Sequence, residues 1–472
     1  MKNRMLAWAA LATLLAPVLG AQTFSHEISL AGLGDPNAAV RPFGISYEPT
    51  TDRLYVAIAG TFSSNNSSVA VIDATTDTVL HTIDVGLFPE DIAFAYAPTG
   101  SYLYGAVTNS SSGSVTIWDA NDQVLATVQL PDPWGMGTCY PFGICLNRAG
   151  THFLVSTNDG SGMVYSIELG TWVQDTMHDF QMNAGAGGRL KSTSNRLFIP
   201  TTTYTASWSG SEAGLETHGV PNSAGTLPTE NNIFQLDDTF STYPSAADVE
   251  VLSDGRVLVS GMSCAGQLWV YSGQGEPLRA IQTADAYGLA VNADETVLAM
   301  CTLAGDTILF VDLETYEVIQ EVFTNGLGGN FYSMPNEAVF ANDKLFVTMQ
   351  ANEAVVVLDN LPMGGGTSAF AGSLTVGNAT PNPGESVTIS LSGSGAVALV
   401  SSTGNTPTLA SNGLMLNIGP DHLLRGSAMR NFTRSYRIPA TAQMRGMHFF
   451  IQGIVDARGL AIATAPRAIV IQ

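Results

Sequence analysis

The chain has 472 residues, of which 45% are hydrophobic and 12% charged, and its formal net charge is −22. That length exceeds what one small core usually supports, so we expect two domains or one large repeat architecture. The low charge content and 48 glycines are typical of an exported β protein and exclude a helical bundle or a disordered chain. An acidic surface repels phosphate backbones and anionic lipid heads, which makes nucleic acid and membrane surfaces poor partners.

The first twenty residues have the pattern of a secretory signal peptide. Lys2 and Arg4 supply the positive end, Met5–Leu15 is apolar, and small residues end at Gly20. We expect cleavage after Gly20 or Ala21 and a secreted protein, in the periplasm, in the medium or on the cell surface. The apolar stretch is too short for a spanning helix, and no later run reaches the necessary length. An uncleaved anchor is the alternative.

Four cysteines in an exported protein fit two disulfides, in any of three pairings. Cys139 and Cys145 bracket a short turn, whereas Cys264 and Cys301 lie near equivalent places in consecutive repeats. We expect the pairs 139–145 and 264–301, with free structural thiols as the alternative. No cysteine and histidine spacing indicates zinc.

The stretch Asp52–Gly86 contains three alternating runs, Leu54–Ala59, Ser68–Asp73 and Val79–Val85, separated by turn residues. Such runs predict half-buried antiparallel strands. Imperfect copies of this unit recur along most of the chain, which indicates a repeat protein. The regular copies span Pro42–Gly86, Pro89–Leu130, Pro141–Phe180, Ala246–Thr283, Ala286–Phe323 and Asn336–Asn360.

A fourth, irregular copy opens near Gly188, contains the long polar insertion Thr205–Glu230, and resumes at Asn232. Long loops inside compact units are usually functional or disordered. The last copy stops one strand short, and the segment His26–Leu33 resembles the missing strand. We therefore predict a seven-bladed β-propeller closed by the N-terminal strand, with only short edges exposed. The irregular fourth copy leaves six or eight blades as alternatives.

The sequence PFGISYEPTTDRLYVAIAG, followed by SSVAVIDATTDTVLHTIDVG, resembles the repeats of YVTN-type (YncE-like) β-propellers. The resemblance is strong in the first two copies, fair in the third, sixth and seventh, and weak between Gly188 and Thr283. It implies a seven-bladed and mostly exported fold, related to the propeller lactonases and to the amine-dehydrogenase heavy chain.

A Gly- and Ser-rich linker follows the repeats, and about seven short strands then predict an immunoglobulin-like β-sandwich. The C-terminal stretch MHFFIQGIVDARGLAIATAPRAIVIQ resembles a sandwich module that ends many exported bacterial proteins. The expected organisation is a signal peptide at 1–20, the propeller at 21–360, the linker at 361–371 and the sandwich at 372–472.

The usual catalytic motifs are missing. No two histidines have the spacing of a metal site, and there is no GxSxG elbow for a hydrolytic serine. We therefore expect no catalytic residue, metal or cofactor. Asp73, Asp119 and Asp312 recur at the ends of third strands, and Asp359 matches them. A carboxylate at such a turn accepts backbone N–H bonds, so we assign these residues a structural role.

The first residues of the innermost strands are more informative, because in a propeller they surround one mouth of the central channel. Rings, carboxylates and a guanidinium there can bind a small polar ligand or a peptide. The alternative is that the rings are packing and the charged groups are solvated. The candidates are Phe43, Glu90, Asp91, Phe142, Arg189, Asp248, Tyr287 and Glu337. Trp208 and His218, in the long insertion, are candidate loop contacts.

The leading hypothesis is a secreted, non-catalytic binding or scaffold protein, expected to be a monomer. Its partner would be a small polar ligand, a peptide, or a protein on a cell surface. One alternative is a lactonase-like hydrolase, which would need His, Arg and Glu to converge at the channel mouth. Arg189 is the strongest candidate for that role. The other alternative is a structural or adhesive surface component.

Overall fold

The computed structural model describes residues 24–361 except 62, 136, 194–195, 205–210, 220–231, 236–244, 263–266, 273–275, 284–285, 304, 325–332 and 360; beyond 361 it describes only strand segments between 373 and 470. The chain divides into two units. One comprises Phe24–Tyr316 and Glu321–Met363, and the other contains Gly364–Gln472.

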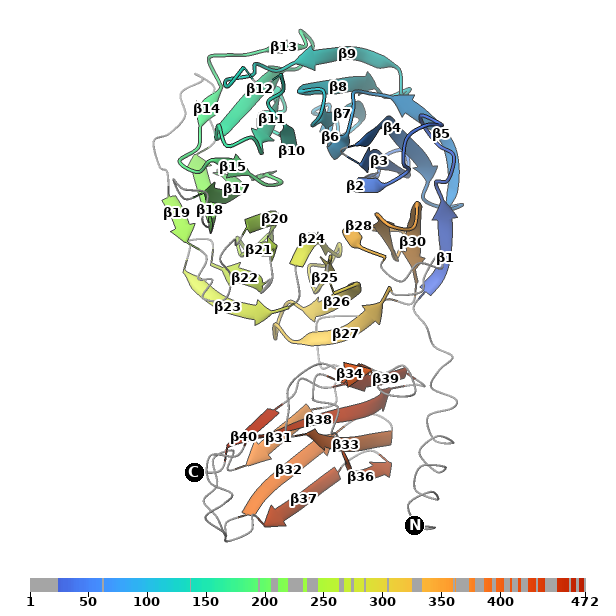
Figure 1. The fold of residues 1–472 in the computed structure, drawn as a ribbon, viewed down its shortest axis with the longest axis vertical. Helices are drawn as coiled ribbons and strands as arrows, with labels where there is room; N and C mark the ends of the chain where they lie inside the picture. Colours follow the sequence, from blue (N-terminus) through green and yellow to red (C-terminus); the bar gives the residue numbers. More distant parts are fainter. Residues whose placement is uncertain are drawn as a thin grey trace. The chain divides into compact units, whose positions relative to one another are not determined.

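The first unit is a ring of seven antiparallel sheets that follow one another in chain order (Figure 1). The strands of blades 1 to 3 are β2 (Pro42–Glu48), β3 (Arg53–Thr61), β4 (Ser64–Asp73), β5 (Thr78–Asp84), β6 (Pro89–Tyr96), β7 (Tyr102–Asn109), β8 (Ser114–Asp119), β9 (Val124–Gln129), β10 (Pro141–Leu146), β11 (His152–Thr157), β12 (Met163–Glu168), β13 (Val173–Gln174) and β14 (Phe180–Gln181).

The strands of blades 4 to 7 are β15 (Ala186–Gly187), β16 (Lys191–Ser192), β17 (Arg196–Tyr204), β18 (Ser211–Gly219), β19 (Asn232–Gln235), β20 (Ser245–Val251), β21 (Val257–Met262), β22 (Gln267–Tyr271), β23 (Pro277–Gln282), β24 (Ala286–Val291), β25 (Val297–Thr302), β26 (Thr307–Asp312), β27 (Val318–Phe323), β28 (Pro335–Ala341), β29 (Lys344–Met349) and β30 (Ala354–Leu358). The predicted all-β, seven-bladed propeller is confirmed.

The N-terminal strand closes the ring, as the sequence predicted. β1 (Phe24–Ser29) pairs antiparallel with β30, with Ile28 opposite Val355. The strand ends at Ser29 rather than Leu33, although the Leu30 N–H still donates to Glu353 O at 2.8 Å. Ile28 and Leu30 are buried in a core cluster that includes residues of blades 1 and 7. The two ends of the ring are thus held together by ladder bonds and by apolar contact.

Truncating the closing strand should weaken the whole propeller. We expect Ile28→Ala to lower the free energy of unfolding by about 2–5 kcal/mol, because it leaves a cavity where the ring closes. Urea denaturation followed by tryptophan fluorescence measures this loss. Glu27→Ala, whose side chain lies on the other face of β1, is the control and should change stability by no more than about 0.5 kcal/mol. Equal effects of the two variants would contradict the closure.

The inner strands are buried on both faces, so the prediction of half-buried strands is wrong for them. In β3 every residue from Leu54 to Gly60 is buried. Tyr55 packs with Trp118 of blade 2, whereas Val56 packs in a cluster with Phe346 of blade 7. Each blade lies face to face with two neighbours, which removes the solvated face that an isolated sheet would have. Only outer strands such as β5 keep mainly exposed positions.

The insertion of the fourth repeat contains a strand where we predicted a loop. β18 pairs with β17 over nine residues and is itself paired with β19. Small and charged residues obscure the strand pattern of β18 in the sequence. In the structure Ala213 and Leu215 pack against Phe198 and blade 5. His218 is accordingly buried rather than an exposed contact residue, with Nε2 2.7 Å from Glu216 Oε1. Trp208 lies outside the described residues.

The cysteine pairing is also wrong. Cys139, Cys145 and Cys301 are buried free thiols. Cys139 lies in the core cluster between blades 2 and 3, whereas Cys145 lies in the cluster on the opposite face of β10 with Leu190. The two side chains therefore point away from each other and cannot meet. Cys264, the expected partner of Cys301, lies outside the described residues.

The turn role of the recurring aspartates is confirmed where the structure shows their bonds. Asp73 Oδ1 accepts the Thr76 N–H at 2.7 Å, and Asp119 Oδ1 accepts the Asn121 N–H at 2.8 Å. Asp312 Oδ1 accepts the Thr315 N–H at 2.7 Å. Hydrogen bonds from Thr76, first from its backbone, hold the pKa of Asp73 below its ordinary value. These residues belong to the blade scaffold.

In the second unit the described strands form a three-stranded sheet (β31-β32-β37), a five-stranded sheet with β38 at its centre, and the pair β34-β35. Their bounds are β31 (Ser373–Gly377), β32 (Ser386–Ser392), β33 (Ala396–Ser402), β34 (Thr408–Leu409), β35 (Met415–Leu416), β36 (Leu423–Met429), β37 (Phe432–Arg437), β38 (His448–Ala457), β39 (Leu460–Ala463) and β40 (Arg467–Val470). The immunoglobulin-like sandwich stays a prediction. Among the described residues no helix has the length and apolar character to cross a membrane.

Candidate functional site

One equivalent position at the innermost strand of each blade carries an unusual set of residues; in blade 4 it lies between β15 and β16. The blades contribute, in order, Gly44, Asp91, Gly143, Arg189, Asp248, Gly288 and Glu337. Three blades supply an acid and three supply a glycine. Glycine and acid alternate around the ring. Because the number of blades is odd, one blade is left out of this alternation, and that blade supplies Arg189.

Each acid reaches the next blade of the ring. Asp91 Oδ2 accepts the Ile144 N–H at 2.8 Å, and Asp248 Oδ2 accepts the Leu289 N–H at 2.8 Å. Glu337 Oε2 accepts the Ile45 N–H at 3.0 Å, which joins blade 7 to blade 1. Each donating N–H belongs to the residue that follows a glycine. A side chain at Gly288 would overlap the backbone of Asn336, so the close approach of the blades requires a residue without Cβ.

Hydroxyls of the second strands add a second set of bonds between blades. Thr108 Oγ1 donates to Phe142 O at 2.6 Å, Ser156 Oγ to Gly188 O at 2.7 Å, and Thr348 Oγ1 to Phe43 O at 2.7 Å. The sequence reasoning missed these residues. The signal was a Ser or Thr at the equivalent place in the second strands of blades 2, 3 and 7.

The guanidinium of Arg189 lies among these acids and a group of rings. Its Nη2 is 2.9 Å from Glu337 Oε2, and its Nε is 3.9 Å from Asp91 Oδ1. Its central carbon lies 5.3 Å from the centroid of Tyr287 and 5.8 Å from that of Phe43, within the range of cation–π attraction. The Phe43 ring is also 6.2 Å from the rings of Phe88, Phe142 and Tyr287. The structure thus brings all the predicted mouth candidates into one neighbourhood.

Burial dominates the protonation of the group. It raises the pKa of Glu90 and of Glu337 well above the ordinary value, although the charge of Arg189 opposes this. It also raises the pKa of Asp91, and that of Asp248 to about 6. Burial alone would lower the pKa of Arg189, but the nearby carboxylates, Glu337 foremost, raise it, and the guanidinium stays charged. Near neutral pH the group therefore holds one fixed cation and the mostly ionised carboxylate of Asp248, whereas burial favours the neutral form of Glu90 and Glu337.

Two members of the group have unused hydrogen-bonding capacity. Arg189 and Glu90 are each 4% exposed. Despite the ion pair, none of the three guanidinium nitrogens makes a hydrogen bond, and Glu90 Oε2 has no partner. Most buried polar atoms in native proteins are bonded, and leaving one unbonded costs about 1–3 kcal/mol. The remaining acids, by contrast, are occupied by backbone N–H groups. Arg189 and Glu90 are thus the two members of this group that retain capacity for further hydrogen bonds.

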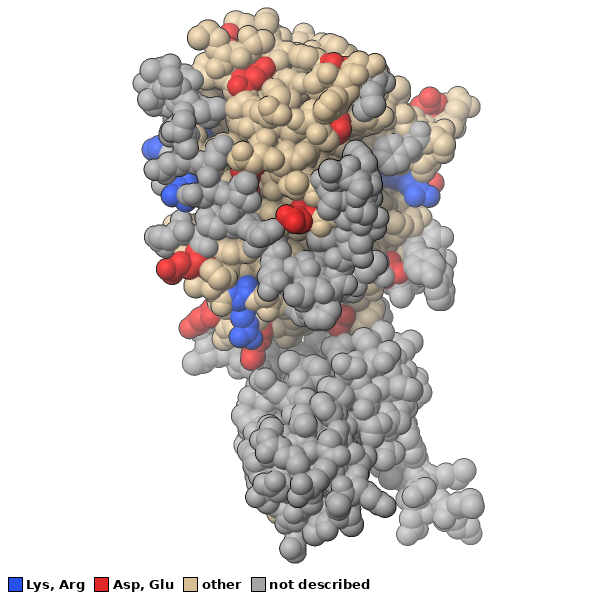
Figure 2. Space-filling view, turned by 60° about the vertical axis from the view of Figure 1, so that its left-hand side comes forward, with Lys and Arg blue, Asp and Glu red and all other residues tan. Residues whose placement is uncertain are grey.

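The surface charge is dispersed. On the described part of the face displayed in Figure 2, acidic and basic side chains are scattered and most of the surface is uncharged. The exclusion of nucleic acid stays a prediction.

The comparisons with known proteins support the fold alone. No family model and no curated protein matches the sequence. The chain is similar in structure to Kuenenia stuttgartiensis hydrazine synthase, with a TM-score of 0.54 and 14% identity over 68% of this chain and 96% of the other. It also aligns with the Cps50 (Swd1) β-propeller domain of Myceliophteria thermophila, with a TM-score of 0.49 and 10% identity over 72% and 99% of the two chains.

Proposed function

We propose that this protein is a non-catalytic binding protein whose ligand site is the Arg189 group at the centre of the propeller. The observation that supports it most strongly is the unused hydrogen-bonding capacity of Arg189 and Glu90 among buried rings. A propeller is compatible with a binding or scaffold role, but the fold by itself names no ligand.

The charges around Arg189 favour a neutral ligand. The mostly ionised Asp248 already balances the charge of the single guanidinium, and any further carboxyl that ionises makes the group negative, so a phosphate or a carboxylate ligand gains no net attraction. A hydroxyl or amide oxygen can accept from the guanidinium, and a hydroxyl or N–H can donate to Glu90. The rings of Phe43 and Tyr287 can cover the apolar face of such a molecule. We therefore propose a small neutral solute with hydroxyl or amide groups, or the amide backbone of a peptide.

A thermal-shift screen tests this preference. N-acetylglucosamine, D-glucose, L-glutamine and glycylglycine are the probes, with inorganic phosphate as the anionic control. At least one neutral probe should raise the midpoint of unfolding in proportion to the logarithm of its concentration, and phosphate should not. A shift by phosphate alone would contradict the proposal.

The lactonase-like alternative rests on the same group, because a carboxyl with a raised pKa can act as a general acid or base. However, among the residues described around Arg189 there is no histidine. Incubation with γ-butyrolactone and detection of the hydroxy acid separates the two functions. We expect no hydrolysis above that by the Glu90→Gln variant, and hydrolysis that this variant abolishes would favour the enzyme. The adhesive role has no specific structural support.

We also propose that the protein is exported and related to the YVTN-type propellers, with a C-terminal sandwich that attaches or orients it. The N-terminal pattern and the repeat motifs support this. N-terminal sequencing of the protein from its native host tests the export. The mature chain should begin at Ala21 or Gln22, so that β1 is kept, and an intact Met1 would contradict cleavage.

A further inference from the structure

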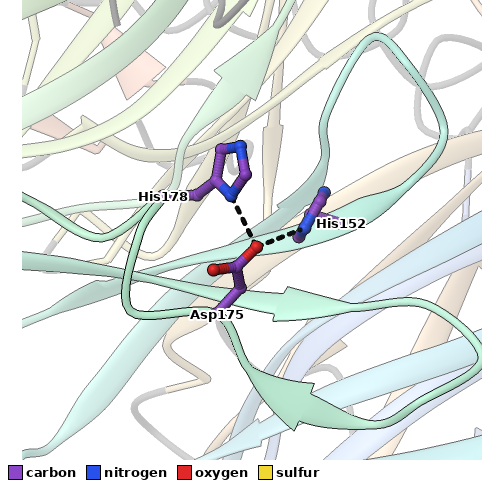
Figure 3. A group of neighbouring side chains, drawn as sticks. All are labelled: His152, Asp175 and His178. Atoms are coloured by element: carbon purple, nitrogen blue, oxygen red, sulfur yellow. Dashed lines mark hydrogen bonds and ion pairs between the residues drawn. The ribbon is translucent and has the colours of Figure 1, made fainter. Parts of the chain in front are cut away.

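A second group of polar side chains lies in blade 3, away from the Arg189 group. His152 is the first residue of β11, and Asp175 and His178 belong to the turn between β13 and β14 (Figure 3). Asp175 Oδ2 is 3.3 Å from His152 Nε2 and 2.6 Å from His178 Nδ1. One ligand atom from each of the three residues falls within 4.8 Å of the others.

Backbone bonds hold the turn in this conformation. The Asp175 N–H donates to Ser166 O at 2.7 Å, which ties the turn to β12. Asp175 Oδ1 accepts the Met177 N–H at 3.0 Å, so that Oδ2 is directed at the two imidazoles. His152 is fixed by pairing with Glu168 of β12. The strand pairing and the backbone bonds of the turn therefore hold the three side chains close together.

We propose that His152, Asp175 and His178 form a binding site for a zinc ion. Two imidazole nitrogens and one carboxylate oxygen are a common zinc ligand set, with bond lengths of about 2.0–2.1 Å. Tetrahedral ligands at that distance lie about 3.3 Å from one another; Asp175 Oδ2 is 3.3 Å from His152 Nε2 and 2.6 Å from His178 Nδ1, so small side-chain shifts bring the three atoms to this spacing. The side chains are 11%, 26% and 24% exposed, so an ion can enter and a fourth position faces solvent.

A partner for the outer nitrogen of His152 is already in place. Thr151 Oγ1 lies 2.8 Å from His152 Nδ1, and Asn147 Nδ2 donates to the same hydroxyl at 3.1 Å. When Nε2 gives up its proton to bind the ion, the proton on Nδ1 can be accepted by Thr151. Metal-binding histidines generally have such a partner, which orients the ring and raises its basicity.

Other histidine and carboxylate contacts in the described part of the chain lack a third ligand. The closest comparison is His81, whose Nε2 is 3.0 Å from Asp122 Oδ2. That carboxylate also accepts from Arg53 at 2.7 Å and from Tyr55 at 2.8 Å, so its charge is already compensated. His81 therefore provides a matched control.

The test is calorimetric titration of the untagged mature protein with Zn²⁺ after treatment with EDTA. We expect one equivalent to bind, and His152→Gln or His178→Gln to weaken binding by about 100-fold. His81→Gln should bind like the wild type. Absence of binding, or binding that both site variants retain, would overturn the proposal, and the latter would assign the ion to another site.

Two further measurements separate ligand loss from misfolding. The wild type and the site variants should have the same circular dichroism spectrum in EDTA, and only the wild type and His81→Gln should gain thermal stability from Zn²⁺. Thr151→Val keeps all three ligands and should weaken binding by about 10-fold. Co²⁺ in place of Zn²⁺ should give visible absorption bands of a four-coordinate ion, and these bands appearing unchanged in His178→Gln would contradict the site.

Discussion

Replacing Arg189 with methionine should lower the free energy of unfolding by about 3–5 kcal/mol at pH 7, because it leaves buried carboxyls without their cation. Methionine keeps much of the volume and the contact with Tyr287, so the loss reports mainly the charge. Guanidinium denaturation at several pH values is the appropriate measurement.

The sign of the pH dependence follows from the raised pKa values. A carboxyl whose pKa is higher in the folded than in the unfolded protein stabilises the fold below its unfolded pKa, and that contribution is lost as the pH rises through the folded value. For Asp248 this stabilising contribution is lost as the pH rises from the ordinary pKa of an aspartate to about 6. For Glu90 and Glu337, whose pKa values are raised well above the ordinary value, the loss continues to higher pH. Without the charge of Arg189 the pKa values of these carboxyls should rise further. The loss in free energy of unfolding caused by Arg189→Met should therefore be largest at pH 8 and smallest at pH 5. A defect independent of pH would show that Arg189 acts only through packing.

Adding one methyl group at Gly288 should be almost as damaging. The Cβ of Gly288→Ala would overlap Asn336 O and lie 2.7 Å from the Cα of Glu337, both backbone atoms that cannot rotate away. We expect a loss of about 3 kcal/mol, because blades 6 and 7 must move apart. Thermal and urea unfolding measure it.

Gly185→Ala is the matched control, since the nearest atom to its Cβ is 3.5 Å away and its backbone does not have a positive φ. It should change stability by less than about 1 kcal/mol. Equal losses at Gly185 and Gly288 would show that the glycines matter for the flexibility of the unfolded chain rather than for the close approach of the blades.

Much of the propeller could be predicted from the sequence because its information is local and repeated. Seven copies of one strand pattern give the blade count, and the missing strand of the last copy has a match at His26. The residues around Arg189 could be predicted to lie together for the same reason, since equivalent positions in the blades of a propeller surround its axis.

What could not be predicted depends on contacts between blades. The acids at Asp91 and Asp248 look like ligand residues in the sequence, whereas their bonds to the next blade show that they join blades. β18 was missed because its small residues gain their stability from blade 5. His152 and His178 are 26 positions apart, so no spacing rule brings them together; only the turn after β13 does.

The central claim is that Arg189 and Glu90 hold the ligand. Calorimetric titration of the best-binding probe, N-acetylglucosamine or another member of the panel, into the wild type and the Glu90→Gln variant tests it most directly. Glutamine replaces a carboxyl whose neutral form burial already favours, so the fold should be unaffected, while an amide group takes the place of the carboxyl that would bond the ligand. We predict a loss of affinity of about 10-fold or more, equivalent to one hydrogen bond of about 1.5 kcal/mol. Equal affinity of the two proteins for the probe would contradict the claim.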